Sequence, residues 1–139
     1  MARDSATRWS LSALSLFMFV GACGAGLTAA QADALRQQLR AAMQQPVVTR
    51  QERDRHSRLL ADVVGKDALH GLDQDQVRAA FGRGEACRSA LCAQHGFTQD
   101  DWLYEIGHAE DPKIKQLPVL IVGFDPQRRA TRVWTLTTH

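Results

Sequence analysis

The sequence feature that most constrains the fold is a continuous apolar run, Pro118–Phe124 (Pro-Val-Leu-Ile-Val-Gly-Phe). A strand without polar positions is typical of the middle of a sheet. Two other segments, residues 101–106 and 132–137, alternate apolar and polar side chains, which is typical of strands with one buried face. We therefore predict a three-stranded antiparallel sheet with residues 118–124 at its centre. Val133 and Trp134 fall on opposite faces, so we expect a second element or a partner to cover the other side.

Three segments before the sheet have helical features. Residues 33–45 place apolar side chains on one face, and residues from about 50 to 64 end in an apolar stretch before Gly65. The third helix is short: Asp73 is its predicted N-cap, and Gln76 three residues later completes a capping box. Helices followed by strands predict an α+β fold. In this fold two helices pack on the three-stranded antiparallel sheet, and an N-terminal signal or anchor helix precedes them.

The N-terminus has the three parts of a secretory signal. Arg3 and Arg8 lie in a short polar lead, an uncharged apolar run follows over residues 11–20, and small residues continue to Ala32. Most short apolar runs are buried core helices, but the terminal position and the flanking arginines favour export. We expect three regions: a lipoprotein signal peptide over residues 1–22, a tether with a short helix over 23–49, and the α+β domain over 50–139.

Three fates of the N-terminus are open after export. Val20-Gly21-Ala22-Cys23 resembles a bacterial lipobox, in which the cysteine is lipidated and becomes the new N-terminus. Ala30-Gln31-Ala32 matches an A-x-A cleavage site, which would give a soluble protein that begins at Asp33. Residues 9–32 carry no charge and are long enough to stay as an uncleaved helical anchor. We favour lipidation of Cys23, which holds the chain at the membrane.

The cysteine count supports that choice. The chain has three cysteines, and an odd number in an exported protein leaves one thiol unexplained. Lipidation of Cys23 accounts for the odd one and leaves Cys87 and Cys92 as a disulfide pair suited to an oxidising compartment. Both lie in a loop predicted over residues 83–100, and closing so small a loop stabilises the fold by about 2 kcal/mol on the loop-entropy model. The alternative is two free, half-buried thiols.

Composition and motifs give little support to catalysis, metal binding or nucleic-acid binding. The formal net charge is +2 without a basic run, so the sequence has no electrostatic footprint for nucleic acid. A thiol–imidazole pair of Cys87 or Cys92 with His95 lacks a third, orienting group, and the spacing is not that of a zinc motif. We expect no enzyme activity, no metal and no cofactor. We also expect the scattered histidines to face solvent: His56, His70 and His139.

The aromatic side chains of the strands are the remaining candidates for a site. Trp102, Tyr104 and Trp134 either fill the core between the sheet and the helices or face outward as anchors of a protein interface. Filling the core is the simpler interpretation, and the interface is the functional one.

The third helix and the strands resemble a known family. The matching residues are Gly71-Leu72-Asp73, Gln76-Val77, Phe81-Gly82, Asp101-Trp102-Leu103-Tyr104, Val122-Gly-Phe-Asp125 and Arg132-Val133. Over about residues 69–137 this pattern is similar to the SmpA/OmlA (BamE-like) family of small outer-membrane lipoproteins. The resemblance implies two helices packed on a three-stranded antiparallel sheet.

The same resemblance implies a function. We expect a non-catalytic envelope lipoprotein, a scaffold or accessory protein at the periplasmic face of the outer membrane and linked to outer-membrane protein assembly. Its partners would be the membrane, through an N-terminal lipid or helix, and envelope assembly proteins, with no nucleic acid. The alternative is an anchored or secreted protein-binding module, such as an inhibitor or an envelope sensor.

Overall fold

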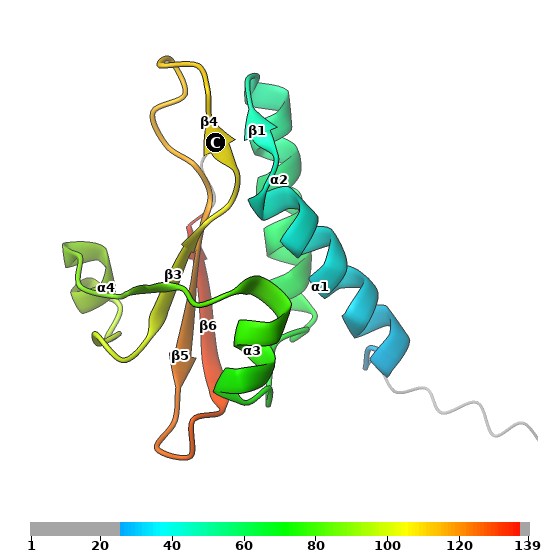
Figure 1. The fold of residues 1–139 in the computed structure, drawn as a ribbon, viewed down its shortest axis with the longest axis vertical. Coiled ribbons are helices and arrows are strands. Elements are labelled where there is room, and N and C mark those ends of the chain that lie inside the picture. The colour runs from blue at the N-terminus through cyan, green and yellow to red at the C-terminus, as the bar shows by residue number, and fades with distance from the viewer. Residues whose placement is uncertain (1–25, 137–139) are drawn as a thin grey trace, which may run out of the picture.

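The computed structural model describes residues 26–136 (Figure 1). The lipobox with Cys23, the signal peptide and most of the uncleaved anchor lie outside the described residues. The helices are α1 (Ala29–Met43), α2 (Arg50–Gly65), α3 (Gln74–Phe81) and α4 (Ala90–Gln94). The strands are β1 (Pro46–Val47), β2 (Glu85–Ala86), β3 (Trp102–Glu105), β4 (His108–Ala109), β5 (Val119–Phe124) and β6 (Ala130–Leu136). Among residues 26–136, no helix combines the length and apolar character needed to cross a membrane.

The main sheet is antiparallel and runs in the order β2-β3-β5-β6. β5 is central, as its apolar sequence predicts, and Leu120, Ile121 and Val122 are fully buried. The predicted α+β class is confirmed. Two details differ from the prediction: β2 adds a fourth, two-residue strand, and β1 and β4 form a separate parallel pair. Runs of two residues carry no periodicity, so no sequence pattern marks them.

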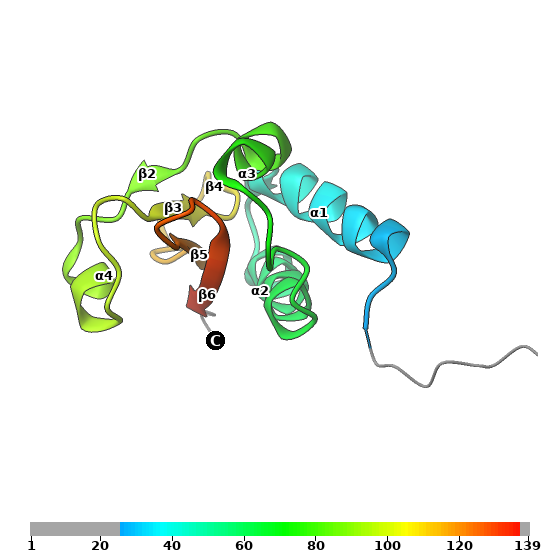
Figure 2. The same ribbon diagram turned by 90° about the horizontal axis from the view of Figure 1, so that it is seen from below.

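The helices α1, α2 and α3 cover one face of the main sheet, and α4 lies on the other side (Figure 2). Val63 of α2 and Val77 of α3 are fully buried and pack in one cluster with Trp102, Tyr104 and Leu120 of the sheet. This cluster is the main core. Leu72, which precedes the α3 cap, packs against it.

The first helix belongs to this core. Leu39 and Ala42 of α1 are buried in the same cluster, and the Arg36 guanidinium donates to the carbonyl oxygen of Ala68 at 2.8 Å. The prediction that residues 23–49 form only a tether is therefore wrong for α1. The apolar stripe of α1 is thin, but α2 supplies the surface that buries it.

The opposite face of the sheet is covered by the segment that the sequence predicts as a loop over residues 83–100. Inside it, β2 pairs with β3, and α4 is held by the side chain of Ser89, which accepts from the Cys92 N–H at 3.4 Å. Cys87, Cys92 and Phe97 pack on Ile121 of the central strand in a second, smaller cluster. This explains why β5 is apolar on both faces.

Local signals define the helix starts. Capping boxes begin α1 at Thr28, α2 at Thr49 and α3 at Asp73. The sequence predicts only the last, and the structure confirms it, with Gln76 N–H donating to the Asp73 carboxylate at 2.7 Å. In the α2 box, backbone N–H groups of Val48 and Thr49 donate to Glu52 and lower the pKa of its carboxyl.

One histidine is not where the sequence places it. His56 of α2 is 4% exposed, so the prediction that it faces solvent is wrong. Its Nε2 lies 3.2 Å from Oε1 of Gln45, and among the described residues its Nδ1 has no hydrogen-bond partner. The charged sequence around His56 obscures its position on the buried face of α2. His70 is exposed, as predicted, and His139 lies outside the described residues.

The role of α1 in the core predicts the effect of truncating Leu39. Leu39→Ala would remove a fully buried side chain and lower the free energy of unfolding by about 2–5 kcal/mol. Urea denaturation of the full chain measures this difference. Gln37→Ala, at an exposed position of the same helix, is the control and would change stability little. Equal stabilities of the two variants would show that α1 is a tether after all.

Candidate functional site

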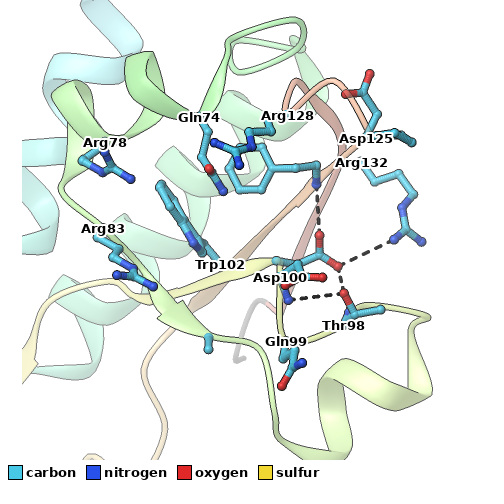
Figure 3. A pocket seen from close by; sticks show the side chains of 14 residues that line it. Gln74, Arg78, Arg83, Thr98, Gln99, Asp100, Trp102, Asp125, Arg128 and Arg132 are labelled. Atoms are coloured by element: carbon cyan, nitrogen blue, oxygen red, sulfur yellow. Dashed lines mark hydrogen bonds and ion pairs between the residues drawn. The ribbon is translucent and has the colours of Figure 1, made fainter.

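A wide hollow of the described surface lies between α3, the loop before β3 and the turn that joins β5 to β6. It is an open cleft of about 680 Å³. Figure 3 shows Arg78, Arg83 and Trp102 on one side, and Thr98 and Asp100 on the other. The remaining lining residues are Gln74, Ala86, Gln99, Asp101, Phe124, Asp125, Pro126, Arg128 and Arg132. We call this hollow the arginine cleft.

Besides Arg132, which pairs with Asp101, three arginines supply positive charge to the cleft from two parts of the chain. Arg78 of α3 lies 5.7 Å from the ring centroid of Trp102 and makes an exposed ion pair with Asp75 at 3.3 Å. Such exposed pairs are weak. Within residues 26–136, the guanidinium groups of Arg83 and Arg128 have no hydrogen bond or ion pair with protein. The cleft therefore presents unneutralised donors for an anionic group.

Arg128 is held by an unusual backbone conformation. Its φ is +61°, a left-handed value that disfavours side chains larger than glycine or asparagine. The Arg128 N–H donates to the Asp125 carbonyl oxygen at 2.8 Å, and the Gln74 N–H donates to the Arg128 carbonyl oxygen at 2.9 Å. These bonds tie the β5–β6 turn to the start of α3. The turn begins at Asp125-Pro126, with proline at the favoured second position.

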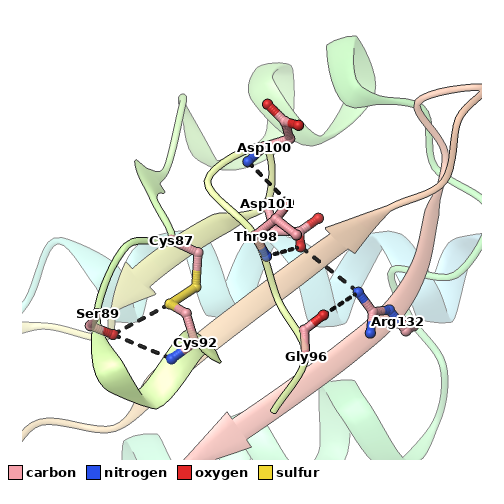
Figure 4. The surroundings of a disulfide bond; sticks show 8 residues. All are labelled: Cys87, Ser89, Cys92, Gly96, Thr98, Asp100, Asp101 and Arg132. Atoms are coloured by element: carbon pink, nitrogen blue, oxygen red, sulfur yellow. Dashed lines mark hydrogen bonds and ion pairs between the residues drawn. A yellow bond between two sulfur atoms is a disulfide. The ribbon is translucent and has the colours of Figure 1, made fainter. Parts of the chain in front are cut away.

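The carboxylate of Asp101 organises the other side of the cleft (Figure 4). It is 3% exposed and accepts from the Thr98 N–H at 2.8 Å and from the Phe124 N–H at 3.0 Å. Arg132 lies 3.8 Å away and also donates to the Gly96 carbonyl oxygen at 3.0 Å. Because both carboxylate oxygens are occupied by backbone donors, Asp101 has a positioning role.

Cys87 and Cys92 form the predicted disulfide, with Cα atoms 5.6 Å apart. Both are buried against the sheet, and the Ser89 hydroxyl lies 3.3 Å from the sulfur of Cys92. The alternative of two free thiols is therefore wrong. A bonded cysteine cannot supply a thiolate, so this pair does not serve as a nucleophile with His95.

Two of the three predicted interface aromatics are core residues. Trp102 is 4% exposed and Tyr104 is 8% exposed. The Tyr104 hydroxyl donates to the Gly82 carbonyl oxygen at 2.8 Å, and its ring meets Phe81 edge-on. Burial excludes both as outward anchors, because α3 covers the face on which they lie. Trp134 is half-buried on the opposite face and stacks on His95 with ring centroids 4.0 Å apart.

The sequence did not predict the arginine cleft. Its arginines are separated by up to fifty positions between Arg78 and Arg128, and only the fold brings them together. The one available local signal is Arg128, because an arginine occupies the position after Asp125-Pro126-Gln127 where glycine is favoured in this kind of hairpin. Residues 26–136 contain no group of three or more histidine, cysteine or carboxylate side chains arranged to hold a metal ion.

Comparison of the chain with protein-family models, with curated proteins and with solved structures finds no match. The interpretation of the site therefore depends on the residues themselves.

The bonds of Asp101 predict a large effect of a small change. Asp101→Asn would replace one acceptor oxygen with a donor and leave a backbone N–H unpaired, lowering the free energy of unfolding by about 2–3 kcal/mol. Asp100→Asn, at the exposed neighbouring position, would stay within about 0.5 kcal/mol of the parent protein. Urea denaturation measures both, and similar stabilities would contradict the role given to Asp101.

Burial predicts the alkaline behaviour of Tyr104. Burial raises the pKa of Tyr104 above its usual value of 10.0, so the folded protein keeps the phenol protonated where the unfolded chain ionises it. The contribution is complete below about pH 10 and is lost as pH rises beyond it. Tyr104 is the only tyrosine of the chain, so tyrosinate absorbance reports this residue alone.

We expect this absorbance to be delayed beyond the pH range of free tyrosine and to rise together with the loss of circular dichroism from the folded state. Tyr104→Phe is the control for alkaline stability, because it removes the titration and retains the ring. Tyrosinate absorbance with the free-tyrosine midpoint in a fully folded protein would contradict the burial argument.

Proposed function

We propose that this protein is a non-catalytic envelope lipoprotein of the SmpA/OmlA (BamE-like) type. Lipid on Cys23 holds it at the membrane, and it acts as a scaffold or accessory protein at the periplasmic face of the outer membrane. In this proposal it works by binding other proteins, with the assembly of outer-membrane proteins as the process it serves.

The disulfide is the observation that carries the proposal. Cys87 and Cys92 are bonded, and the chain has three cysteines, so Cys23 is the one left for another use. Structural disulfides are typical of oxidising compartments such as the periplasm. A single cysteine at the end of an apolar leader is what a lipobox requires, so the pairing supports both export and lipidation.

The start of α1 supports cleavage before Cys23 over the alternative site after Ala32. Thr28 and Gln31 form the capping box of α1, and Leu27 packs against the core. Cleavage after Ala32 would remove all three and expose the first turn of a helix that belongs to the domain. Cleavage before Cys23 leaves the helix complete.

With lipid on Cys23, the same geometry would keep the domain close to the membrane. α1 begins at Ala29, six positions after Cys23, and a chain of this length spans at most about 20 Å. A lipid on Cys23 would therefore keep the N-terminal end of α1 near the bilayer surface. The rest of the domain would remain available to proteins in the periplasm.

The arrangement of elements supports the family resemblance. α2 and α3 pack on the antiparallel strands β3, β5 and β6, which is the plan that the resemblance implies. In this interpretation α1, α4 and β2 are additions of this chain. The capping residue Asp73 and the buried Val77, Trp102 and Tyr104 are motif residues with core roles, so the resemblance concerns the scaffold.

Lipidation predicts a defined labelling result. In Gram-negative cells expressing the full chain, radioactive palmitate would label the parent protein, and Cys23→Ala would take up none. The matched control is the double variant Cys87→Ala and Cys92→Ala, which would keep the label if it accumulates. Label on Cys23→Ala would overturn the lipoprotein assignment, and the mass of the mature N-terminus would then identify the true cleavage site.

Partnership needs a separate test. Cross-linking in cells followed by purification of the tagged protein would recover subunits of the β-barrel assembly machinery. A clean negative from labelled, membrane-bound protein would remove the assembly function and leave the alternative of an anchored protein-binding module, such as an inhibitor or an envelope sensor. The open arginine cleft favours that alternative as the second candidate, because it offers a binding surface whatever the pathway.

A further inference from the structure

We propose that the arginine cleft binds an acidic, extended peptide segment of a partner protein, with carboxylates of the segment held by Arg83 and by Arg128. The inference deepens the proposed function, on which it rests, by naming the surface and the chemistry of the partner.

Among the described residues, the guanidinium N–H groups of Arg83 and Arg128 are hydrogen-bond donors without a protein partner. A guanidinium presents its N–H groups in a planar fork that matches a carboxylate. Arg83 and Arg128 line the cleft without an ion pair or side-chain hydrogen bond among the described residues, and Arg78 is engaged only by the exposed Asp75. Figure 3 shows these arginines around the indole of Trp102. The fold thus gathers cations around Trp102 and leaves Arg83 and Arg128 without a counter-ion among the described residues.

The backbone of Arg128 also points to a role of its side chain. A left-handed φ of +61° is a strained conformation for arginine, and glycine would relieve it. The strain is compatible with a role of the side chain, because the turn needs no arginine for its own bonds: the Arg128 N–H and carbonyl oxygen make them. What the arginine adds to the turn is a cation in the cleft.

The carboxylates of the cleft select the occupant. Asp100 lies across the cleft from Arg78 and Arg83, and Asp125 lies in the same turn as Arg128, so a surface of uniformly negative charge would be repelled by them. A segment with a carboxylate and with neutral or basic neighbours satisfies both walls. The volume of about 680 Å³ exceeds that of a single small anion and accommodates several residues of extended chain. An acidic peptide therefore fits the charges better than an anionic membrane does.

The test uses the full-length protein in neutral detergent and a labelled serine-rich peptide that carries two glutamates, read by fluorescence anisotropy. A second peptide with glutamine in place of glutamate has the same shape without charge. We expect the glutamate peptide to bind and the glutamine peptide not to bind. Added salt would weaken the complex, because the attraction is between exposed charges.

The variants locate the site. Arg83→Gln and Arg128→Gln would each weaken binding about tenfold, the loss expected for a charge-assisted hydrogen bond. Arg88→Gln, at an exposed position outside the cleft, is the matched control and would bind like the parent protein. Arg128→Gly would lose binding while its melting temperature equals or exceeds that of the parent, which separates the role of the side chain from folding.

Several results would overturn the proposal. These are equal binding of the two peptides, unchanged affinity of the double variant Arg83→Gln and Arg128→Gln, or an equal loss in Arg88→Gln. Arginine-dependent binding to vesicles of phosphatidylcholine and phosphatidylglycerol, with none to the peptide, would make the cleft a membrane site instead.

Absence of peptide binding in a protein that is labelled at Cys23 and recovers assembly subunits would remove the cleft proposal alone. Loss of label and of those subunits would remove the proposed function, and peptide binding would still be measurable.

Discussion

The carboxylate of Asp101 is the interaction on which the arrangement of this small domain depends. It joins three segments that are distant in sequence: the Thr98 turn, the end of β5 at Phe124, and Arg132 of β6. The backbone carbonyl oxygen of Asp101 also accepts from the Cys87 N–H at 3.0 Å. A buried charge is tolerated only where it is fully hydrogen-bonded, so this carboxylate fixes the segment after the disulfide against the sheet. Both the second core and one wall of the arginine cleft follow from that.

The disulfide helps to cover the second apolar face of the central strand. β5 is apolar on both faces, but the three longer helices cover only one. Among the described residues only the five-residue α4 lies on the other face, and small domains often compensate with cross-links. Here the bond between Cys87 and Cys92 closes a short segment over Ile121, with Phe97 beside it. The cover is compact, and it depends on an oxidising environment.

The sequence predicted those parts of the structure that local chemistry determines. The apolar composition of residues 118–124 identified the central strand, the pair Asp73 and Gln76 identified the start of α3, and the cysteine count identified the disulfide. Alternation in β3 showed which side chains share a face, but a strand pattern does not say what covers that face. For that reason Trp102 was compatible with both core and interface. The cleft was not predictable, because its charges meet only through tertiary packing.

The arginine cleft is built from the same bonds that stabilise the fold, which links binding to stability. The carbonyl oxygen of Arg128 holds the first N–H of α3, and Arg83 directly follows the Gly82 that ends that helix. Their backbone positions are therefore set before a ligand arrives, so little backbone conformational entropy is lost on binding. A ligand that bound only the folded cleft would stabilise the domain by about 2.7 kcal/mol at a concentration one hundred times its Kd.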